Sequence, residues 1–233
     1  MADGQAGPGG ARVAGQAATG PVQAAGLSAR TIARALDRPP RLDDLPLEIE
    51  AFDRGDHMMN PDRAIFASGP LKAAAVLVPL VTYPDALQVL LTHRAKTLAR
   101  HAGQIAFPGG RVDPEDIDLV ACALRETEEE IGLPRDRIEV LGALDPYLTA
   151  TGYVVAPIVG LVAPGFDLRL DQREVASSFE VPLDFLLDEG NHRQDSGHFQ
   201  GRERHWWAIP YGEHYIWGAT AGMLRNLRER LAG

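Results

Sequence analysis

The chain has only one cysteine in 233 residues, Cys122. A single cysteine cannot form a disulfide within the chain, which excludes a disulfide-stapled fold and is typical of a reducing cytoplasm. No cluster of histidines or further cysteines accompanies it, so we expect Cys122 to be a small packing residue rather than a metal ligand.

Long apolar runs and an excess of positive charge are also missing. No run approaches the ~20 apolar residues of a membrane-spanning helix, and the start lacks the basic and then apolar pattern of a secretory signal. The net charge is -9, which argues against nucleic acid or an anionic membrane as a partner, since no basic surplus would neutralise phosphates. A small phosphorylated molecule stays compatible, because a bound divalent cation inverts the local charge. We therefore expect a cytoplasmic protein that binds neither nucleic acid nor membranes.

The composition divides the chain into three segments. Residues 1–27 consist mainly of Gly, Ala, Pro and Gln, which cannot bury enough apolar surface to fold, so we predict a disordered tail. Residues 28–70 predict a short helix from Ser28 to about Asp37 and then an irregular wrap. Residues 71–233 are long enough for one domain with its own core and a C-terminal helix.

Apolar and β-branched runs within the third segment predict its strands and helices. The strands are expected at residues 73–81, 87–94, 138–144 and 154–162, with weaker candidates at 178–181, 204–209 and 215–217. Short apolar repeats predict helices at residues 182–187 and from Thr220 to the end. Strands on both sides of a central helix, with a closing helix, indicate a layered α/β or α+β domain.

The most informative stretch is a Pro-Gly-Gly turn at residues 108–110 followed by a glutamate-rich helix that stops at Gly132. On a helix with about 100° per residue, Glu129 and Glu130 lie about 60° and 40° to either side of Glu126. Three carboxylates on one stripe repel one another unless a cation binds them. Hard oxygen ligands of this kind suit Mg²⁺ or Mn²⁺.

The opposite side of this helix is expected to face the core. Glu128 lies about 200° from Glu126 around the helix and is therefore excluded as a ligand. Apolar residues share its side and are expected to be buried: Ile117, Ala121, Leu124 and Ile131.

Residues 125–133 read Arg-Glu-Thr-Glu-Glu-Glu-Ile-Gly-Leu. With the preceding Gly-Gly turn, this stretch resembles the Nudix box, the metal-binding motif of a superfamily of diphosphate hydrolases. Three further stretches look like the coenzyme A pyrophosphatase branch of this superfamily. They are Leu-Leu-Thr-His-Arg-Ala at residues 90–95, its continuation through residues 103–110, and Ile-Trp-Gly-Ala-Thr-Ala at residues 216–221. The resemblance runs from about residue 72 to the end and implies an α/β/α sandwich with a mixed sheet between helices.

Three positions depart from the family pattern. One extra residue separates Gly110 from Arg125, so the acid that usually stands early in the box could be any of three residues, namely Glu115, Asp116 or Asp118. Thr127 replaces the usual apolar residue of the motif. Ala99 stands where the branch often has arginine, and Arg100 follows it.

The resemblance implies a role for each residue of the box. The metal ligands would be Glu126, Glu129, Glu130 and the carbonyl oxygen of Gly110. Arg125 would orient Glu129 through a salt bridge. For the general base, Glu129 is the first candidate and Glu174 the second, since Arg-Glu-Val at residues 173–175 resembles a later loop that contributes a carboxylate in some family members.

Substrate choice depends on the stretch upstream of the turn. Coenzyme A carries a diphosphate and a 3′-phosphate, so its pocket needs additional cations. One local basic cluster lies near the motif in sequence: Arg94, Lys96, Arg100 and His101. Arg94 and Arg100 are the candidate substrate-binding residues, and the alternative is a solvated strand and loop.

The leading interpretation is an Mg²⁺- or Mn²⁺-dependent enzyme that hydrolyses coenzyme A or its thioesters to 4′-phosphopantetheine and 3′-phospho-AMP. A second interpretation keeps this chemistry with ADP-ribose, a dinucleotide or another nucleoside diphosphate derivative as the substrate. A third is a non-catalytic nucleotide sensor, which the intact set of Arg125 and three glutamates argues against. A homodimer is left open, since dimers are common in the superfamily but the sequence locates no interface.

Overall fold

The computed structural model describes residues 27–46, 48, 51–60, 69–99, 101–199 and 201–232. The predicted disordered tail lies outside the described residues except for Leu27, and so does the candidate substrate-binding residue Arg100. The division between the 28–70 segment and the domain that follows it stays a prediction. Among the described helices, none has the length and apolar character needed to cross a membrane.

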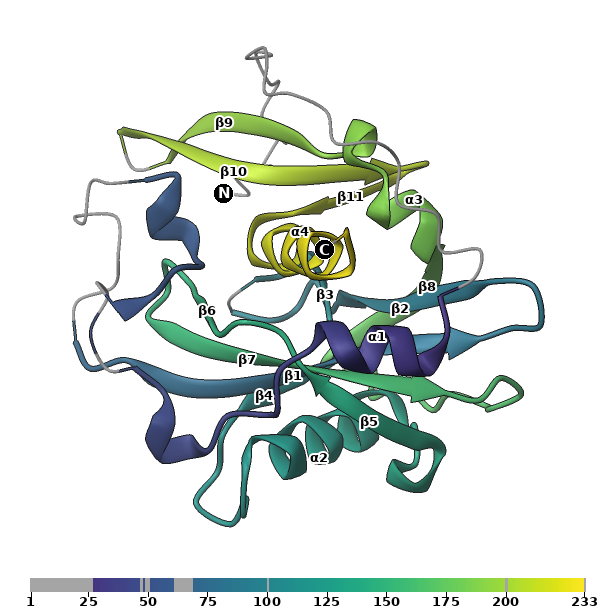
Figure 1. The fold of residues 1–233 in the computed structure, drawn as a ribbon. Coiled ribbons are helices and arrows are strands. Elements are labelled where there is room, and N and C mark those ends of the chain that lie inside the picture. Colours follow the sequence, from purple (N-terminus) through teal and green to yellow (C-terminus); the bar gives the residue numbers. More distant parts are fainter. Residues whose placement is uncertain are drawn as a thin grey trace.

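A mixed eight-stranded sheet forms the centre of the fold (Figure 1). Its strands are β1 (Lys72–Thr82), β2 (Leu87–Arg94), β3 (Ile105–Ala106), β4 (Gly109–Arg111), β5 (Ile138–Ala143), β6 (Tyr147–Leu148), β7 (Tyr153–Val162) and β8 (Val175–Pro182). The order is β3-β2-β1-β7-β5, with β4 paired to β1, β6 to β7 and β8 to β2. β1 and β7 run parallel along ten residue pairs, whereas the other pairs are antiparallel.

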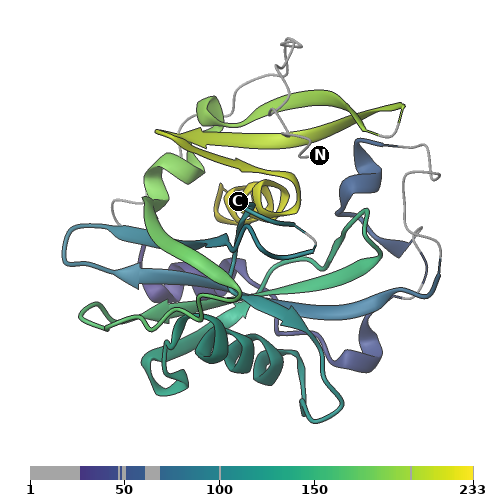
Figure 2. The same cartoon turned by 180° about the vertical axis from the view of Figure 1, so that it is seen from behind.

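Helices cover both faces of this sheet, as expected for an α/β/α sandwich (Figures 1 and 2). α2 (Leu119–Ile131) lies on one face, and α4 (Gly218–Ala232) lies on the other with α1 (Ala29–Ala35) and α3 (Leu183–Leu187) nearby. Beyond α4 lies a second, three-stranded antiparallel sheet of β9 (Arg193–Phe199), β10 (Arg202–Tyr211) and β11 (His214–Trp217). α4 is therefore enclosed between two sheets, which accounts for its burial on several sides.

The predicted strands are all present, but several are longer than expected. β8 and β10 extend the predicted runs by two to three residues at one or both ends because backbone pairing continues beyond the apolar positions. β9 was missed. Its sequence, Arg-Gln-Asp-Ser-Gly-His-Phe, has no apolar alternation, and only its pairing with β10 makes it a strand.

The N-terminal helix is shorter than predicted and packs onto the main sheet. Ser28 caps it by accepting a hydrogen bond from the Thr31 amide at 3.2 Å, as expected for an N-cap serine. The helix ends at Ala35. Asp37 instead pairs with Ala143 at the end of β5 through two backbone hydrogen bonds of 3.1 and 2.8 Å, so the chain leaves the helix to follow the sheet edge.

The predicted wrap is tied to both sheets by two polar residues. The partly buried Asp56 accepts hydrogen bonds from the Tyr147 hydroxyl at 2.9 Å and from the Ala150 amide at 2.7 Å. Asn60 bonds both the carbonyl and the amide of His205 on β10, at 2.8 and 2.9 Å. The wrap thus connects β6 of the main sheet to the small sheet.

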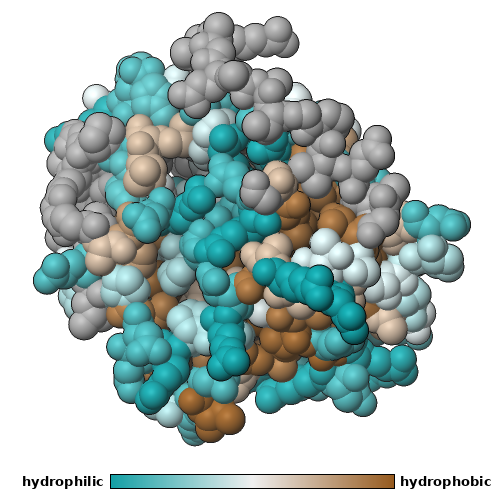
Figure 3. Space-filling model, in the orientation of Figure 1, coloured by the Kyte–Doolittle hydropathy of each residue, from teal (hydrophilic) through white to brown (hydrophobic). Residues whose placement is uncertain are grey.

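Hydrophilic residues cover most of the face seen in Figure 3, and they interrupt its hydrophobic areas. Large apolar side chains that are exposed come from separate parts of the described chain: Leu42, Met58, Tyr83 and Ile117. The apolar residues of the described chain are concentrated inside, between the layers.

Replacing Asp56 by alanine is expected to destabilise the protein by about 1–3 kcal/mol, because the Tyr147 hydroxyl and the Ala150 amide lose their acceptors in a partly buried place. Urea unfolding followed by circular dichroism would measure the change. Asp53→Ala in the same segment is the control, since Asp53 is exposed, and it should change the free energy of unfolding by less than about 0.5 kcal/mol. Equal effects of the two substitutions would contradict the role of Asp56.

Candidate active site

The glutamate helix α2 begins and ends where local chemistry dictates. Asp118 caps it by accepting a hydrogen bond from the Ala121 amide at 2.7 Å. Gly132 ends it in the left-handed conformation with φ of 68° and donates to the Glu128 carbonyl at 2.9 Å. Ile117 therefore precedes the helix, and its 90% exposure shows that the expectation of a buried Ile117 was wrong.

The buried face of α2 differs from the predicted face. It is formed by Leu119, Cys122, Ala123, Thr127, Glu130 and Ile131. Thr127 is accommodated there because its hydroxyl donates to the Ala123 carbonyl at 2.7 Å. Burial raises the pKa of Cys122 to about 12, so its thiol is a packing group at neutral pH, as expected.

Glycine at positions 109 and 110 allows β4 to fit between β1 and α2. Gly109 has φ of 146°, and a Cβ on it would lie 2.5 Å from the Ala75 carbonyl oxygen and the Val76 Cα. A Cβ on Gly110 would lie 2.5 Å from the carboxylate of Glu126. Gly109 therefore has no room for a side chain against the backbone of β1, whereas a side chain at position 110 would displace the Glu126 carboxylate from the turn.

Glu130 is the most buried acid of the site, with 3% exposure. Its Oε2 accepts a hydrogen bond from the Gly109 amide at 3.1 Å, and its Oε1 lies 3.5 Å from Nη1 of Arg94. Burial raises the pKa of Glu130 to about 7, with smaller contributions from the nearby charges of Glu126 and Glu174. Burial also raises the pKa of Glu126. Both carboxylates are therefore placed where a cation would stabilise their charged forms.

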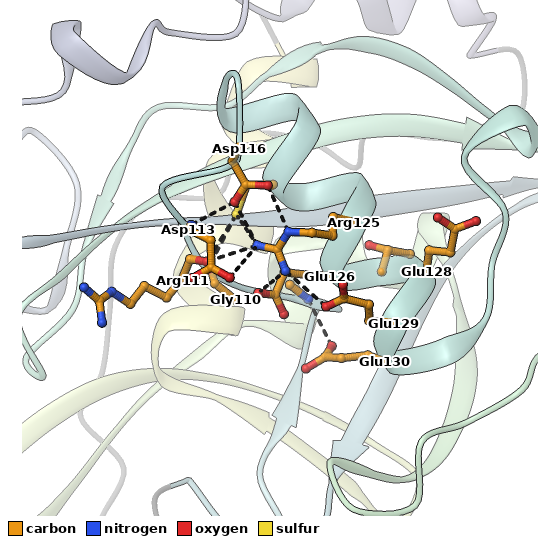
Figure 4. A network of polar contacts seen from close by, with 12 residues as sticks. Gly110, Arg111, Asp113, Asp116, Arg125, Glu126, Glu128, Glu129 and Glu130 are labelled. Carbon is orange, nitrogen blue, oxygen red and sulfur yellow. Dashed lines mark hydrogen bonds and ion pairs between the residues drawn. The ribbon is translucent and has the colours of Figure 1, made fainter.

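Arg125 hydrogen-bonds three carboxylates around this turn and lies 3.9 Å from a fourth, that of Asp113 (Figure 4). It donates to both oxygens of Asp116 at 2.9 and 2.8 Å. Its Nη1 also donates to Glu126 at 3.0 Å and to Glu129 at 3.1 Å. The salt bridge to Glu129 that the family resemblance implied is thus part of a larger network, and the pKa of Asp116 falls to about 2 because Arg125 binds it.

The structure distinguishes among the three acids available early in the motif. Asp116 pairs with Arg125 and its side chain is 4% exposed, whereas Asp118 caps α2 and Glu115 is exposed. Nothing in the linear spacing distinguishes Asp116 from its neighbours, because the turn of residues 113–116 decides which carboxylate faces the helix.

The three glutamates do not lie in equivalent positions. Glu126 and Glu130 face the Gly-Gly turn, whereas the side chain of Glu129 is 60% exposed at the rim and is held by Arg125. Glu128 points away from the other three (Figure 4) and pairs with Arg135 at 2.9 Å. The exclusion of Glu128 from the site thus agrees with its position.

The oxygen donors near the turn are of the kind that binds a hard divalent cation, but the described side chains alone are too few to form a metal site. Among the described residues, no three His, Cys, Asp or Glu side chains form a group that could hold a metal ion. Two carboxylates, from Glu126 and Glu130, meet a glycine turn whose Gly110 carbonyl oxygen faces α2, 3.8 Å from Cys122 Sγ. Oxygen donors of both kinds are those that Mg²⁺ and Mn²⁺ prefer.

The loop that precedes Glu174 brings a distant part of the sequence to the end of α2. The loop before β8 is bound to the end of α2, where the amides of Arg169 and Asp171 donate to the carbonyls of Ile131 and Glu130 at 2.8 and 2.9 Å. Glu174 follows this loop, is exposed, and is close enough for its charge to raise the pKa of Glu126 and Glu130.

Arg94 is the described member of the predicted basic cluster that forms an ion pair with a glutamate of α2, namely Glu130. It ends β2 at a register shift between His93 and Arg94, which directs its side chain to Glu130. Lys96 and His101 are exposed in the following loop. His101 has φ of 57°, and its Nδ1 is 2.9 Å from Gln104 Oε1.

Comparisons with known proteins give matches over most of the chain. A family model described as NUDIX domain matches residues 71–209, which include the turn, α2 and Glu174. The uncharacterized Nudix hydrolase NudL of Cronobacter sakazakii is 39% identical over 186 residues, 80% of this chain and 96% of that protein. The protein of the same name from Klebsiella pneumoniae is 42% identical over 184 residues, 79% and 95% of the two chains. The crystal structure of a C. elegans Ap4A hydrolase binary complex has a TM-score of 0.41 and 21% identity, covering 49% of this chain and 82% of that chain.

Asp116→Asn is expected to destabilise the protein by about 1–3 kcal/mol near pH 6, because Arg125 loses a charged acceptor. The pKa of Asp116 is about 2 in the folded protein, below the ordinary value of 3.8. Its contribution to stability is therefore complete above pH 4 and is lost as the pH falls through about 2. The difference in unfolding free energy between wild type and variant should shrink over this range in urea titrations.

Glu115→Gln is the matched control for this experiment, since it removes a neighbouring exposed carboxylate. It should show no such pH-dependent difference from the wild type. A difference for Asp116→Asn that stays constant from pH 6 to pH 3 would contradict the ion pair.

Proposed function

The chain belongs to the Nudix hydrolase family, and on that basis we propose that it hydrolyses the diphosphate bond of coenzyme A or its thioesters. The products are 4′-phosphopantetheine and 3′-phospho-AMP. Members of the family are pyrophosphohydrolases and generally use divalent metal ions. The observation that carries the proposed reaction is the meeting of Glu126 and Glu130 at the Gly-Gly turn, with Arg94 beside them.

The proposed substrate rests on the sequence upstream of the turn. Residues 90–95 and 103–110 resemble the coenzyme A pyrophosphatase branch, and so do residues 216–221 at the junction of β11 and α4. Coenzyme A needs cationic groups for its additional phosphate. Arg94 supports this assignment because it is the described member of the basic cluster that lies at the carboxylates.

Glu126, Glu130, Glu129 and the Gly110 carbonyl are the residues that would hold Mg²⁺ or Mn²⁺. Such a cation offsets the negative charge of the diphosphate and makes water more acidic. Arg125 keeps Glu126 and Glu129 oriented, and Asp116 holds Arg125 with two hydrogen bonds. The protein therefore supplies a set of carboxylates whose mutual positions exist before substrate binds.

Two carboxylates are candidates for the general base that removes a proton from the attacking water. Glu129 is our first choice, because it lies at the rim, is exposed to solvent and is held by Arg125. Glu174 is the second, because it is exposed and its charge raises the pKa of Glu126 and of the buried Glu130. The two lie on different elements, so their contributions can be separated by mutation.

The alternative substrates are ADP-ribose or another nucleoside diphosphate derivative, which the same carboxylates could serve. A non-catalytic nucleotide sensor is disfavoured, since the motif keeps all of its charged residues: Arg125 binds Glu126 and Glu129, and Glu130 pairs with Arg94. The single cysteine, which is buried, suits an enzyme of the cytoplasm.

Incubation of the purified protein with Mg²⁺ or Mn²⁺ and either coenzyme A or ADP-ribose, followed by mass spectrometry, tests the proposed function. We expect metal-dependent release of 4′-phosphopantetheine, reduced about 10²–10⁴-fold in Glu126→Gln because the site loses a charge that stabilises the transition state. Glu128→Gln, on the far side of the same helix, should retain activity. Turnover of ADP-ribose alone would remove the coenzyme A assignment, and turnover of neither substrate would contradict both assignments.

The pH dependence of kcat would separate the two candidates for the base. Glu129→Gln is expected to lower kcat by about 10²–10⁴-fold and to abolish the acidic limb of the profile. Glu174→Gln should retain that limb with a smaller loss of kcat. The opposite pattern would assign the general base to Glu174.

A further inference from the structure

Arg94 and Arg125 both lie at the glutamates but differ in how firmly they are held. Arg125 is bound by both oxygens of Asp116 in addition to the glutamates. Within the described part of the chain, the guanidinium of Arg94 has a single ion-pair partner, Glu130, at 3.5 Å. The Nε atom of Arg94 is buried and has no hydrogen-bond partner there. Arg125 is thus fixed in place, whereas Arg94 keeps donors free for another anion.

Hydrogen bonds fix the backbone of Arg94, whereas its guanidinium has only the ion pair with Glu130 among the described residues. Its amide donates to the Gln104 carbonyl at 2.9 Å, and its own carbonyl accepts from the Gly103 amide at 3.1 Å. The side chain is 23% exposed. A change of partner by the guanidinium therefore requires rotation about side-chain bonds and no movement of β2.

Glu130 presents one oxygen to Arg94 and cannot easily turn elsewhere. Its other oxygen accepts from the Gly109 amide, and the residue is almost completely buried. A cation bound at Glu130 would therefore share this carboxylate with Arg94. Two positive groups at one carboxylate oxygen repel each other, and the repulsion is strong where water is excluded.

We propose that Arg94 exchanges partners: it neutralises Glu130 until a divalent cation binds there, and it then pairs with a phosphate oxygen of the substrate. This inference rests on the proposed function and adds an order to it, with the cation before the diphosphate. The arginine opposes binding of the cation alone and favours the anionic substrate once the cation is present. Because coupling between two ligands is reciprocal, the substrate also strengthens binding of the cation.

Titration of Mn²⁺ without substrate, by calorimetry, tests the exchange directly. Arg94→Gln removes the competing charge and should bind Mn²⁺ roughly threefold to tenfold more tightly than the wild type. Arg94→Lys keeps a positive charge on a different head group, so its affinity for Mn²⁺ should lie between those of the wild type and Arg94→Gln. Arg135→Gln is the matched control: it removes one arginine that pairs with Glu128 on the outer side of α2, and its Mn²⁺ affinity should equal that of the wild type.

Thermal unfolding and steady-state kinetics give two further readouts. In EDTA, Arg94→Gln should melt at a lower temperature than the wild type, because Glu130 loses its counter-charge, and saturating Mg²⁺ should raise its melting temperature by more. For coenzyme A, KM should rise about tenfold while kcat changes less, since the lost contact is to substrate phosphate. The Arg135→Gln variant should have the melting temperatures and the kinetic constants of the wild type.

Unchanged or weaker Mn²⁺ binding by Arg94→Gln would overturn the exchange, because it would mean that Arg94 either ignores Glu130 or holds it in place for the metal. If Arg94→Gln does not fold, Arg94→Lys decides in the same way. A wild-type protein that binds no Mn²⁺ at all would overturn the proposed function itself. Tighter Mn²⁺ binding by Arg94→Gln without turnover of coenzyme A would support the exchange and contradict only the assignment of the substrate.

Discussion

The burial of one carboxylate between a helix and a glycine turn is the constraint on which the site depends. Glu130 lies on the face of α2 that packs onto the main sheet, so it must find compensation inside the protein. The Gly109 amide supplies a hydrogen bond and Arg94 supplies charge. β4 lies between β1 and α2, where Gly109 leaves no room for a Cβ against the β1 backbone and a Cβ at Gly110 would meet the Glu126 carboxylate. A buried acid that is only partly compensated is also a place where a cation binds favourably.

The remainder of the fold holds the elements that meet at this carboxylate. The parallel pairing of β1 with β7 forms the centre of the sheet, and β4 joins the antiparallel side of β1. The loop before β8 is hydrogen-bonded to the last turn of α2, and Glu174 follows it through a hydrogen bond from its amide to the Asp171 carbonyl. On the other face, α4 and the small sheet close one core cluster, whereas Leu45 and Phe52 of the wrap pack with α2 in another. Both faces of the main sheet are therefore packed, and the glutamates lie on the face that α2 covers.

Local features of the sequence predicted most of the elements and their ends. Ser28 as an N-cap and Gly132 as the end of α2 were predicted, because these effects involve neighbouring residues only. The α/β/α arrangement followed from the resemblance, and the structure agrees with it. Two predictions were wrong or incomplete for different reasons. Ile117 is exposed because Asp118 caps α2 after it, a local signal that the pattern of apolar residues did not show. β9 is a strand only because β10 lies beside it.

By itself, the sequence determined the spacing of the acidic residues and the position of Glu128 on another side of the helix from Glu126, because helical periodicity places residues around an axis without reference to the rest of the chain. The tertiary structure decided which of these acids is buried and which arginine each one meets. Glu130 rather than Glu129 faces the sheet, Asp116 rather than Glu115 holds Arg125, and Arg94 approaches from a strand more than thirty residues away. Such pairings depend on how strands and loops distant in sequence pack against α2, and burial then sets the strength of each charge interaction.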